Sequence, residues 1–198
     1  MRSAGAPHSR WLLYCIVVGI GGLGCKDQKK AVIPKKIDQD ITKKTQSEET
    51  PSTPAGQLAL AIKYYTGEGK PQNLKKAAKY FRIASNNGSH EAQFALGCMY
   101  QNGHGVSQNF MKAAEWYLKA AKADNPNAQF LLGLSYKEGS GVPRDLLESY
   151  KWIFLAAELG NTQHIAARQQ LEQTYSPAMI IEGRRRADQF RMYQGVNN

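Results

Sequence analysis

The sequence predicts an all-α protein: an α-solenoid of three 36-residue helix–turn–helix repeats, followed by a C-terminal capping helix pair. Three observations predict this fold: a glycine triplet that recurs at one interval, aromatic and small residues that recur at the same interval, and apolar spacing typical of helices. The chain has 198 residues, of which 42% are hydrophobic. Such a chain can hold one modest folded domain with tails.

The glycine triplets are Gly67–Gly69, Gly103–Gly105 and Gly139–Gly141, and each lies 36 residues after the one before. A tyrosine precedes each triplet by three residues and a leucine precedes each tyrosine by four: Tyr64, Tyr100 and Tyr136, with Leu60, Leu96 and Leu132. No insertion is needed to align the copies. A fixed period of this length is typical of stacked repeats, in which each unit buries its apolar face against its neighbours.

Each repeat divides into two helices around its glycine triplet. In the second copy an apolar helical stripe runs to Tyr100, and Gly103 suits the left-handed conformation that ends many helices. Asn109 is placed to cap the following helix, because its side-chain oxygen can accept from the free N–H groups of the first turn. We also expect small residues to permit close helix approach and tryptophans to fill the space between repeats: Gly97 and Gly133, and Trp116 and Trp152, respectively.

The predicted organisation has six segments. They are a signal peptide of lipoprotein type (1–24), a disordered tether (25–54), three repeats (55–90, 91–126 and 127–162), and a C-terminal helical cap with a tail (163–198). In the cap, Ser176 followed by Pro177 offers an N-cap and a proline at the first helical position. Residues 26–54 contain no aromatic residue and mix both charge signs, a composition that cannot bury enough apolar surface to fold.

The N-terminus has the features of an export signal. Arg2 and Arg10 precede the uncharged, mostly apolar residues 11–24, a run too short to span a bilayer comfortably. The four residues ending at Cys25 resemble the lipobox of bacterial lipoproteins, and this resemblance implies that Cys25 is lipidated and anchors the chain to a membrane. Ordinary cleavage near Gly24, or an uncleaved anchor, are the alternatives. The expected location is the bacterial cell envelope, lipid-anchored at the outer membrane or on the periplasmic side, or secreted.

The formal net charge of +10 does not identify a ligand. Its excess is distributed over all segments, with +2 in residues 1–25, +2 in 26–57, +4 in 58–163 and +2 in 164–198. A nucleic-acid-binding surface would concentrate the basic residues on one face. We therefore expect no nucleic-acid partner.

Residues 90–123 and 127–161 resemble Sel-one-like repeats (SLR), short relatives of the tetratricopeptide repeat. Residues 56–88 form a weaker copy, with Lys70 after the turn where the other two have valine. The resemblance implies a right-handed α-superhelix with a concave face and a protein or peptide as partner. Bacterial members of this family are often exported and include envelope and host-interaction factors, and an immunity protein that neutralises a secreted toxin would also fit.

No residue pattern indicates catalysis, a metal site or a cofactor. The histidines beyond the signal, His90, His104 and His164, occupy different repeat positions without metal-ligand spacing, and His104 is expected to be a solvated loop residue. Cys98 is expected to be a buried thiol. The alternative function is an enzyme that acts on cell-wall material or β-lactams, as implied by cysteine-rich relatives. This chain lacks the disulfide-forming cysteines of those relatives.

The predicted function is that of a protein-binding scaffold, without enzymatic activity. By analogy with tetratricopeptide grooves, its surface would be formed by the first helices of the repeats. Positions that differ between copies are the best candidates for specificity, and these partner-binding residues form three columns: Lys63, Met99 and Ser135; Tyr65, Gln101 and Lys137; and Thr66, Asn102 and Glu138.

Overall fold

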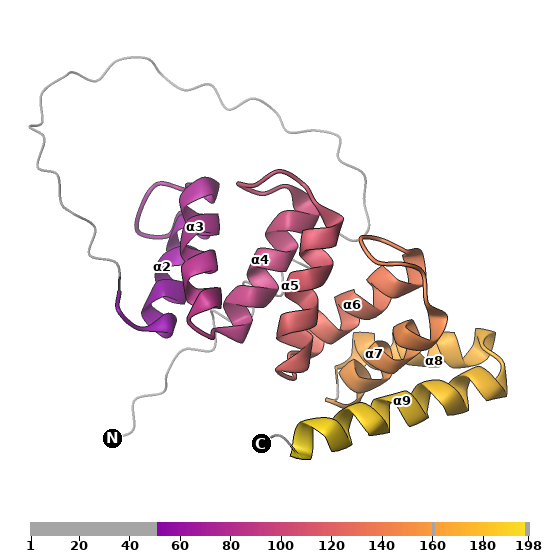
Figure 1. Ribbon diagram of the computed structural model, residues 1–198. Coiled ribbons are helices and arrows are strands. Elements are labelled where there is room, and N and C mark those ends of the chain that lie inside the picture. Colours follow the sequence, from indigo (N-terminus) through magenta and orange to yellow (C-terminus); the bar gives the residue numbers. More distant parts are fainter. Residues whose placement is uncertain (1–50, 160, 197–198) are drawn as a thin grey trace, which may run out of the picture. The chain divides into compact units, whose positions relative to one another are not determined.

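The computed structural model describes residues 51–159 and 161–196. The predicted signal, the lipidation site at Cys25 and the tether up to residue 50 lie outside the described residues. The described part contains eight helices and no strand: α2 (Pro54–Thr66), α3 (Leu74–Asn86), α4 (His90–Asn102), α5 (Phe110–Lys122), α6 (Pro126–Glu138), α7 (Leu146–Glu158), α8 (Thr162–Thr174) and α9 (Pro177–Val196) (Figure 1).

The helices pack in sequence order, as an α-solenoid requires. Within the repeats α2 packs on α3, α4 on α5, and α6 on α7. Between the repeats α3 packs on α4 and α5 on α6, while α7 contacts both α8 and α9 (Figure 1). The all-α solenoid of three repeats is therefore confirmed.

The 36-residue register extends one helix beyond the three predicted repeats. The first helices α2, α4, α6 and α8 each have 13 residues and begin at residues 54, 90, 126 and 162. The period breaks only afterwards, because α9 begins at Pro177, whereas the register of α7 would place that start at residue 182. The first helix of the predicted cap, α8, therefore continues the series of first helices, and α9 closes the array.

The ends of the helices follow from local side-chain chemistry. The side chains of Ser89, Asn109 and Asn125 each accept a hydrogen bond from a first-turn N–H group, as N-caps do. Gly103 ends α4 with a φ of 71°, in the left-handed region that a Cβ disfavours. At the start of α9, the Met179 N–H donates to Ser176 Oγ over 3.4 Å. The predicted caps at Gly103, Asn109 and Ser176 are confirmed.

Glycines set the distance between helices, as predicted. A Cβ on Gly97 would lie 2.5 Å from the Tyr117 ring, and one on Gly133 would lie 2.6 Å from Ile153 Cγ1. Trp152 is buried, and the contact that its ring makes at 5.0 Å is edge-on with Phe190 of the closing helix α9. Trp116 is half-buried with the Lys119 ammonium group over its ring, and its packing between repeats stays a prediction.

The second glycine of each internal turn docks against the preceding repeat. A Cβ on Gly105 would lie 2.1 Å from the carbonyl oxygen of Leu74, the first residue of α3. A Cβ on Gly141 would lie 2.1 Å from that of Phe110, the first residue of α5. Gly69, in the first repeat, has no described atom within 4 Å of that position. These glycines therefore allow backbone-to-backbone contact between repeats.

A glutamine column, which the sequence analysis did not identify, also links the repeats. The side-chain amides of Gln93 and Gln129 donate to the carbonyl oxygens of Ser85 and Ala121, over 3.4 and 3.2 Å. Each acceptor lies eight residues earlier, near the end of the preceding helix. Gln57, at the same position of the first repeat, donates instead to the Pro51 carbonyl oxygen just before α2, over 2.9 Å. The recurrence of glutamine at the repeat interval was the available signal.

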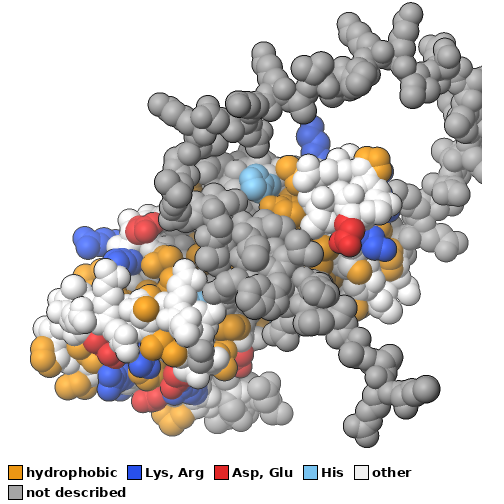
Figure 2. Space-filling model, turned by 180° about the vertical axis from the view of Figure 1, so that it is seen from behind, with side chains coloured by type: hydrophobic (Ala, Val, Ile, Leu, Met, Phe, Trp, Pro, Cys, Tyr) orange, Lys and Arg blue, Asp and Glu red, His pale blue; other side chains and the backbone are white. Residues whose placement is uncertain are grey.

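The closing helix α9 is held by a polar cluster around Tyr150. The Tyr150 hydroxyl donates to Glu172 Oε1 over 2.7 Å, and Arg184 Nε donates to the same hydroxyl over 3.2 Å. Gly183 makes room for the Tyr150 ring, since a Cβ there would lie 2.5 Å from it. Basic and acidic side chains are intermixed over the C-terminal helices, as Figure 2 shows, with ion pairs such as Arg185–Glu182 and Arg186–Glu148.

Candidate partner-binding groove

A cavity of about 310 Å³ lies between α6 and α8. α6 is the first helix of the third repeat, and α8 is the helix that follows it in the same register. Its apolar lining includes Phe130 and Leu134 of α6 and Leu171 of α8, together with two alanines. Its polar lining comes from Lys137, Gln163 and Gln170. An apolar hollow bordered by a few polar groups is the usual form of a site that accepts a side chain or a small ligand.

The repeat register explains why this cavity exists. Ala166 and Gln170 of α8 occupy the positions that Phe130 and Leu134 hold in α6, 36 residues earlier. A phenylalanine replaced by alanine leaves a space beside the preceding helix, which surrounding side chains fill only partly. Phe130 and Leu134 therefore remain half-buried, whereas Phe94 in the second repeat is only 5% exposed.

His164 supports the cavity from behind Phe130. Its ring stacks on Phe130 with the centroids 4.6 Å apart, and its side chain is buried. Burial lowers the pKa of His164, because desolvation disfavours the charged imidazolium; a hydrogen bond with the Ala156 backbone opposes this shift. The ring is thus held neutral, as an apolar wall requires.

The structure distributes the nine predicted partner-binding residues over several environments. Lys137 lines the α6–α8 cavity, and Lys63, Asn102 and Glu138 are exposed. Tyr65, Thr66, Gln101 and Ser135 are half-buried. Of the nine predicted residues, only Lys137 lines this cavity. The other lining residues were not predicted, because α8, which supplies several of them, was assigned to the cap rather than to the repeat array. The signal was the Asn161 N-cap, which follows Asn125 and Ser89 at the repeat interval.

Met99 is a correction, because its side chain is 1% exposed and belongs to the core. A side chain covered by neighbouring helices cannot contact a partner, so Met99 is not a partner-binding residue. Two hydroxyls in the set have local partners instead: Thr66 Oγ1 donates to the Ile62 carbonyl over 3.0 Å, and Ser135 Oγ donates to the Leu131 carbonyl over 2.9 Å. Such bonds to the preceding helical turn leave an acceptor but no free donor.

Tyr65 and Gln101 also have structural partners. The Tyr65 hydroxyl is hydrogen-bonded to His104 Nδ1 over 2.9 Å. This bond joins the end of α2 to the turn of the next repeat. The prediction that His104 is a solvated loop residue is therefore wrong, since its ring is half-buried in this contact. The Gln101 side-chain oxygen accepts from the Tyr117 hydroxyl over 2.6 Å.

Cys98 is buried with a free thiol, as predicted. Burial raises its pKa to about 12, although a hydrogen bond with Tyr117 lowers it in part. A thiol with this pKa is not a thiolate nucleophile at neutral pH. Among the described residues, no group of three or more His, Cys, Asp or Glu side chains is arranged to hold a metal ion. Within the same residues, no helix is both long and apolar enough to cross a bilayer.

Comparisons with known proteins agree with the repeat pattern. The family model of the Sel1 repeat matches residues 54–89, 90–125 and 126–161. The crystal structure of a Sel1 repeat protein from Oxalobacter formigenes is similar, with a TM-score of 0.56 and 35% identity over 59% of this chain and 88% of that one. No curated protein matches the chain.

A second similar structure is c5321, a protective antigen present in uropathogenic Escherichia coli strains, which displays an SLR fold. Its TM-score is 0.57 at 26% identity, over 69% of this chain and 37% of that one, so this chain spans little more than a third of that protein. The three matched repeats cover over half of the present sequence, at one unbroken interval. The chain belongs to the Sel1 repeat family.

Proposed function

We propose that this protein is an exported, membrane-tethered scaffold of the bacterial cell envelope that binds a protein or peptide partner. In this proposal the α6–α8 cavity takes an apolar side chain of the partner, and Lys137 and the glutamines contact its polar groups. The cavity itself is the observation that carries the proposal. Sel1 repeats commonly mediate protein–protein interaction, which supports the same function.

Filling the cavity tests its role. Ala166→Phe restores the residue that α6 has at this position, so the phenyl ring should occupy the hollow while the helices stay packed. Gln169→Phe adds the same ring to the same helix at an exposed position that does not line the cavity. In crosslinked pull-downs from the native envelope, we expect the partner to be recovered with wild type and Gln169→Phe and lost with Ala166→Phe. Equal recovery with all three proteins would refute the assignment of this cavity.

Membrane anchoring is tested separately at Cys25. The residues that carry this part of the proposal are the basic N-terminus, the apolar run of 11–24 and the lipobox-like ending. We expect palmitate labelling of the wild type and none of Cys25→Ala, with Cys15→Ala as the control. Labelling that survives the Cys25 substitution would remove lipidation from the proposal and leave the binding function unaffected.

A further inference from the structure

Basic charge is concentrated in the first repeat. Residues 54–89 contain six basic and one acidic side chain, whereas residues 90–125 contain three of each and residues 126–161 contain three basic and four acidic ones. The net charge of +4 counted for residues 58–163 therefore conceals an uneven distribution among the repeats. That segment combines one strongly basic repeat with two repeats whose net charge is close to zero.

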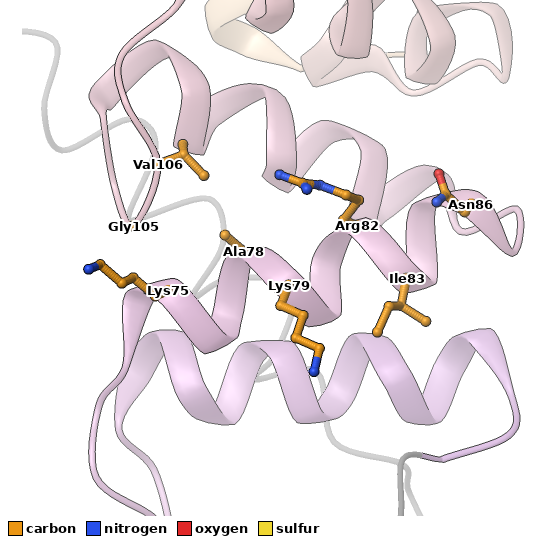
Figure 3. Close-up of a pocket in the computed structure, with 8 residues that line it drawn as sticks. All are labelled: Lys75, Ala78, Lys79, Arg82, Ile83, Asn86, Gly105 and Val106. Atoms are coloured by element: carbon orange, nitrogen blue, oxygen red, sulfur yellow. The ribbon is translucent and has the colours of Figure 1, made fainter.

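Three of these basic side chains line a second cavity, of about 290 Å³, between α3 and the turn of the second repeat. Lys75, Lys79 and Arg82 project from α3, and Val106 comes from the turn (Figure 3). The intervals of four and three residues place the cations along one helical face, over a rise of about 10 Å. Among the lining residues that the structure describes, none is a carboxylate.

Arg82 is held in place across the repeat boundary. Its Nη2 donates to the Tyr100 hydroxyl over 3.1 Å, and Tyr100 is itself nearly buried in α4. A guanidinium group fixed in this way loses little conformational freedom when it binds a carboxylate with its remaining N–H groups. Within the described residues, neither Lys75, Lys79 nor Arg82 forms an ion pair, so their charges are not neutralised by neighbouring carboxylates.

The corresponding positions in the other two repeats carry at most one cation. They are Met111, Glu115 and Leu118 in the second repeat, and Leu147, Lys151 and Phe154 in the third. The fold therefore does not require three cations at these positions. This set of three cations is found in the first repeat alone, and side chains that differ between repeats in this way can give a repeat protein a specific contact.

We propose that this cavity binds an acidic peptide segment of a protein partner. In an extended strand, side chains on one face repeat at about 6.6 Å, which matches the rise of about 6 Å between Lys75 and Lys79. Ala78, Ile83 and Val106 supply apolar surface for the aliphatic part of the glutamates. Three cations would neutralise about three phosphates, fewer than the roughly six to ten contacts that give a DNA-binding protein a steep salt dependence. This cavity shares no residue with the α6–α8 cavity, and the two proposals stand independently.

The test uses the full chain and a fluorescent peptide of about eight residues in which glutamate alternates with serine, long enough to cover the three cations. Its counterpart with glutamine in place of glutamate is the uncharged control. We expect fluorescence anisotropy to show binding of the glutamate peptide only. Affinity should fall as ionic strength rises from about 0.1 M to about 1 M, because the Debye length shortens from about 10 Å to about 3 Å.

Two variants with the same charge change distinguish this site from general attraction. Lys75→Gln/Lys79→Gln/Arg82→Gln should reduce affinity for the glutamate peptide by about tenfold or more. Lys112→Gln/Lys119→Gln/Lys122→Gln removes three exposed cations from α5 and should leave the affinity within about twofold of wild type. Circular dichroism checks that both variants are folded.

Three results would overturn the proposal. One is an equal loss with the α5 variant, which would indicate unspecific charge attraction. Another is the absence of binding to the glutamate peptide in low salt. The third is binding of phosphatidylglycerol vesicles or duplex DNA that depends on Lys75, Lys79 and Arg82 while the peptide does not bind. That result would assign the cations to a membrane or nucleic-acid surface.

Discussion

At the scale of single residues, the second glycine of a turn has two separable roles. It adopts a positive φ, and in the internal repeats it also lets the turn touch the preceding helix. Gly69 and Gly105 separate these roles, since their φ angles are 72° and 70° but only Gly105 has backbone atoms where a Cβ would lie.

We predict that Gly69→Ala lowers the free energy of unfolding by about 1 kcal/mol, the cost of a left-handed non-glycine residue. Gly105→Ala should lower it by about 2 kcal/mol more, because the Leu74 carbonyl must move away. Urea unfolding followed by circular dichroism measures both. Similar values for the two variants would show that docking against α3 contributes nothing.

His164 gives a prediction on pH. Because burial lowers its pKa, the unfolded chain takes up a proton first, near the ordinary value of about 6.5. The stability contributed by neutral His164 is therefore complete above about pH 6.5 and is lost as the pH falls through the lower folded pKa. His164→Phe keeps a ring against Phe130. Denaturant unfolding at pH 7 and pH 5 should show a smaller loss for this variant, and an equal loss would assign the pH dependence elsewhere.

The column of Lys63, Met99 and Ser135 shows what sequence comparison between repeats can miss. Met99 is in the second repeat, with a repeat on each side, and its side chain is covered; Lys63 is in the first repeat and is exposed. Differences within a column can thus reflect position in the array rather than recognition of a partner. The column of Lys75 is a different case, because Met111, at the equivalent position of α5, is 64% exposed. Burial therefore does not explain why the first repeat has a lysine at this position and the second a methionine.

At the scale of secondary structure, the predictable features were those with local causes. Helix caps at Asn109 and Gly103 and the close approach at Gly97 and Gly133 follow from side-chain chemistry near each residue. The position of α9 does not, because it depends on contacts far apart in sequence. Tyr150 stands where the other two repeats have Ala78 and Ala114. Its ring fits against α9 because Gly183 has no Cβ, and its hydroxyl is hydrogen-bonded to Glu172 and Arg184.

Gly183→Ala should consequently loosen α9 without unfolding the first repeats. The added methyl group would contact the Tyr150 ring, and we expect a loss of about 1–3 kcal/mol in local stability. Hydrogen exchange should accelerate in α9 and remain unchanged in α2 and α3. Gln189→Ala, at an exposed position of the same helix, is the control. Uniform acceleration along the chain would mean that α9 is not a separate unit of stability.

At the scale of the whole molecule, the repeats should be interchangeable in register. Deleting residues 90–125 joins Ser89 to Pro126, so that a serine N-cap replaces Asn125 before α6. Gly141 would then face the start of α3 and Gln129 would reach the end of α3, as Gly105 and Gln93 do now. We predict that this shortened protein is folded and helical, with a lower midpoint of thermal unfolding than the wild type.

A deletion of residues 90–119 is the out-of-register control. It removes most of the same helices but places the remaining turn and glutamine contacts six residues out of position. Circular dichroism and thermal melting should show cooperative unfolding for the 36-residue deletion and loss of cooperativity for the shorter one. If both behaved alike, inter-repeat contacts would not depend on the period.

Within residues 51–159 and 161–196, no atom lies within 4 Å of the position that a Cβ on Gly69 would take, and this implies that repeats can be added at one end of the array. A glycine that already permits backbone docking could receive the helix start of an additional unit placed ahead of α2, without redesign of the first turn. The other end differs, since Tyr150 and Gly183 shift α9 out of the register and stop further addition. Engineering longer versions of this protein should therefore proceed from its N-terminal side.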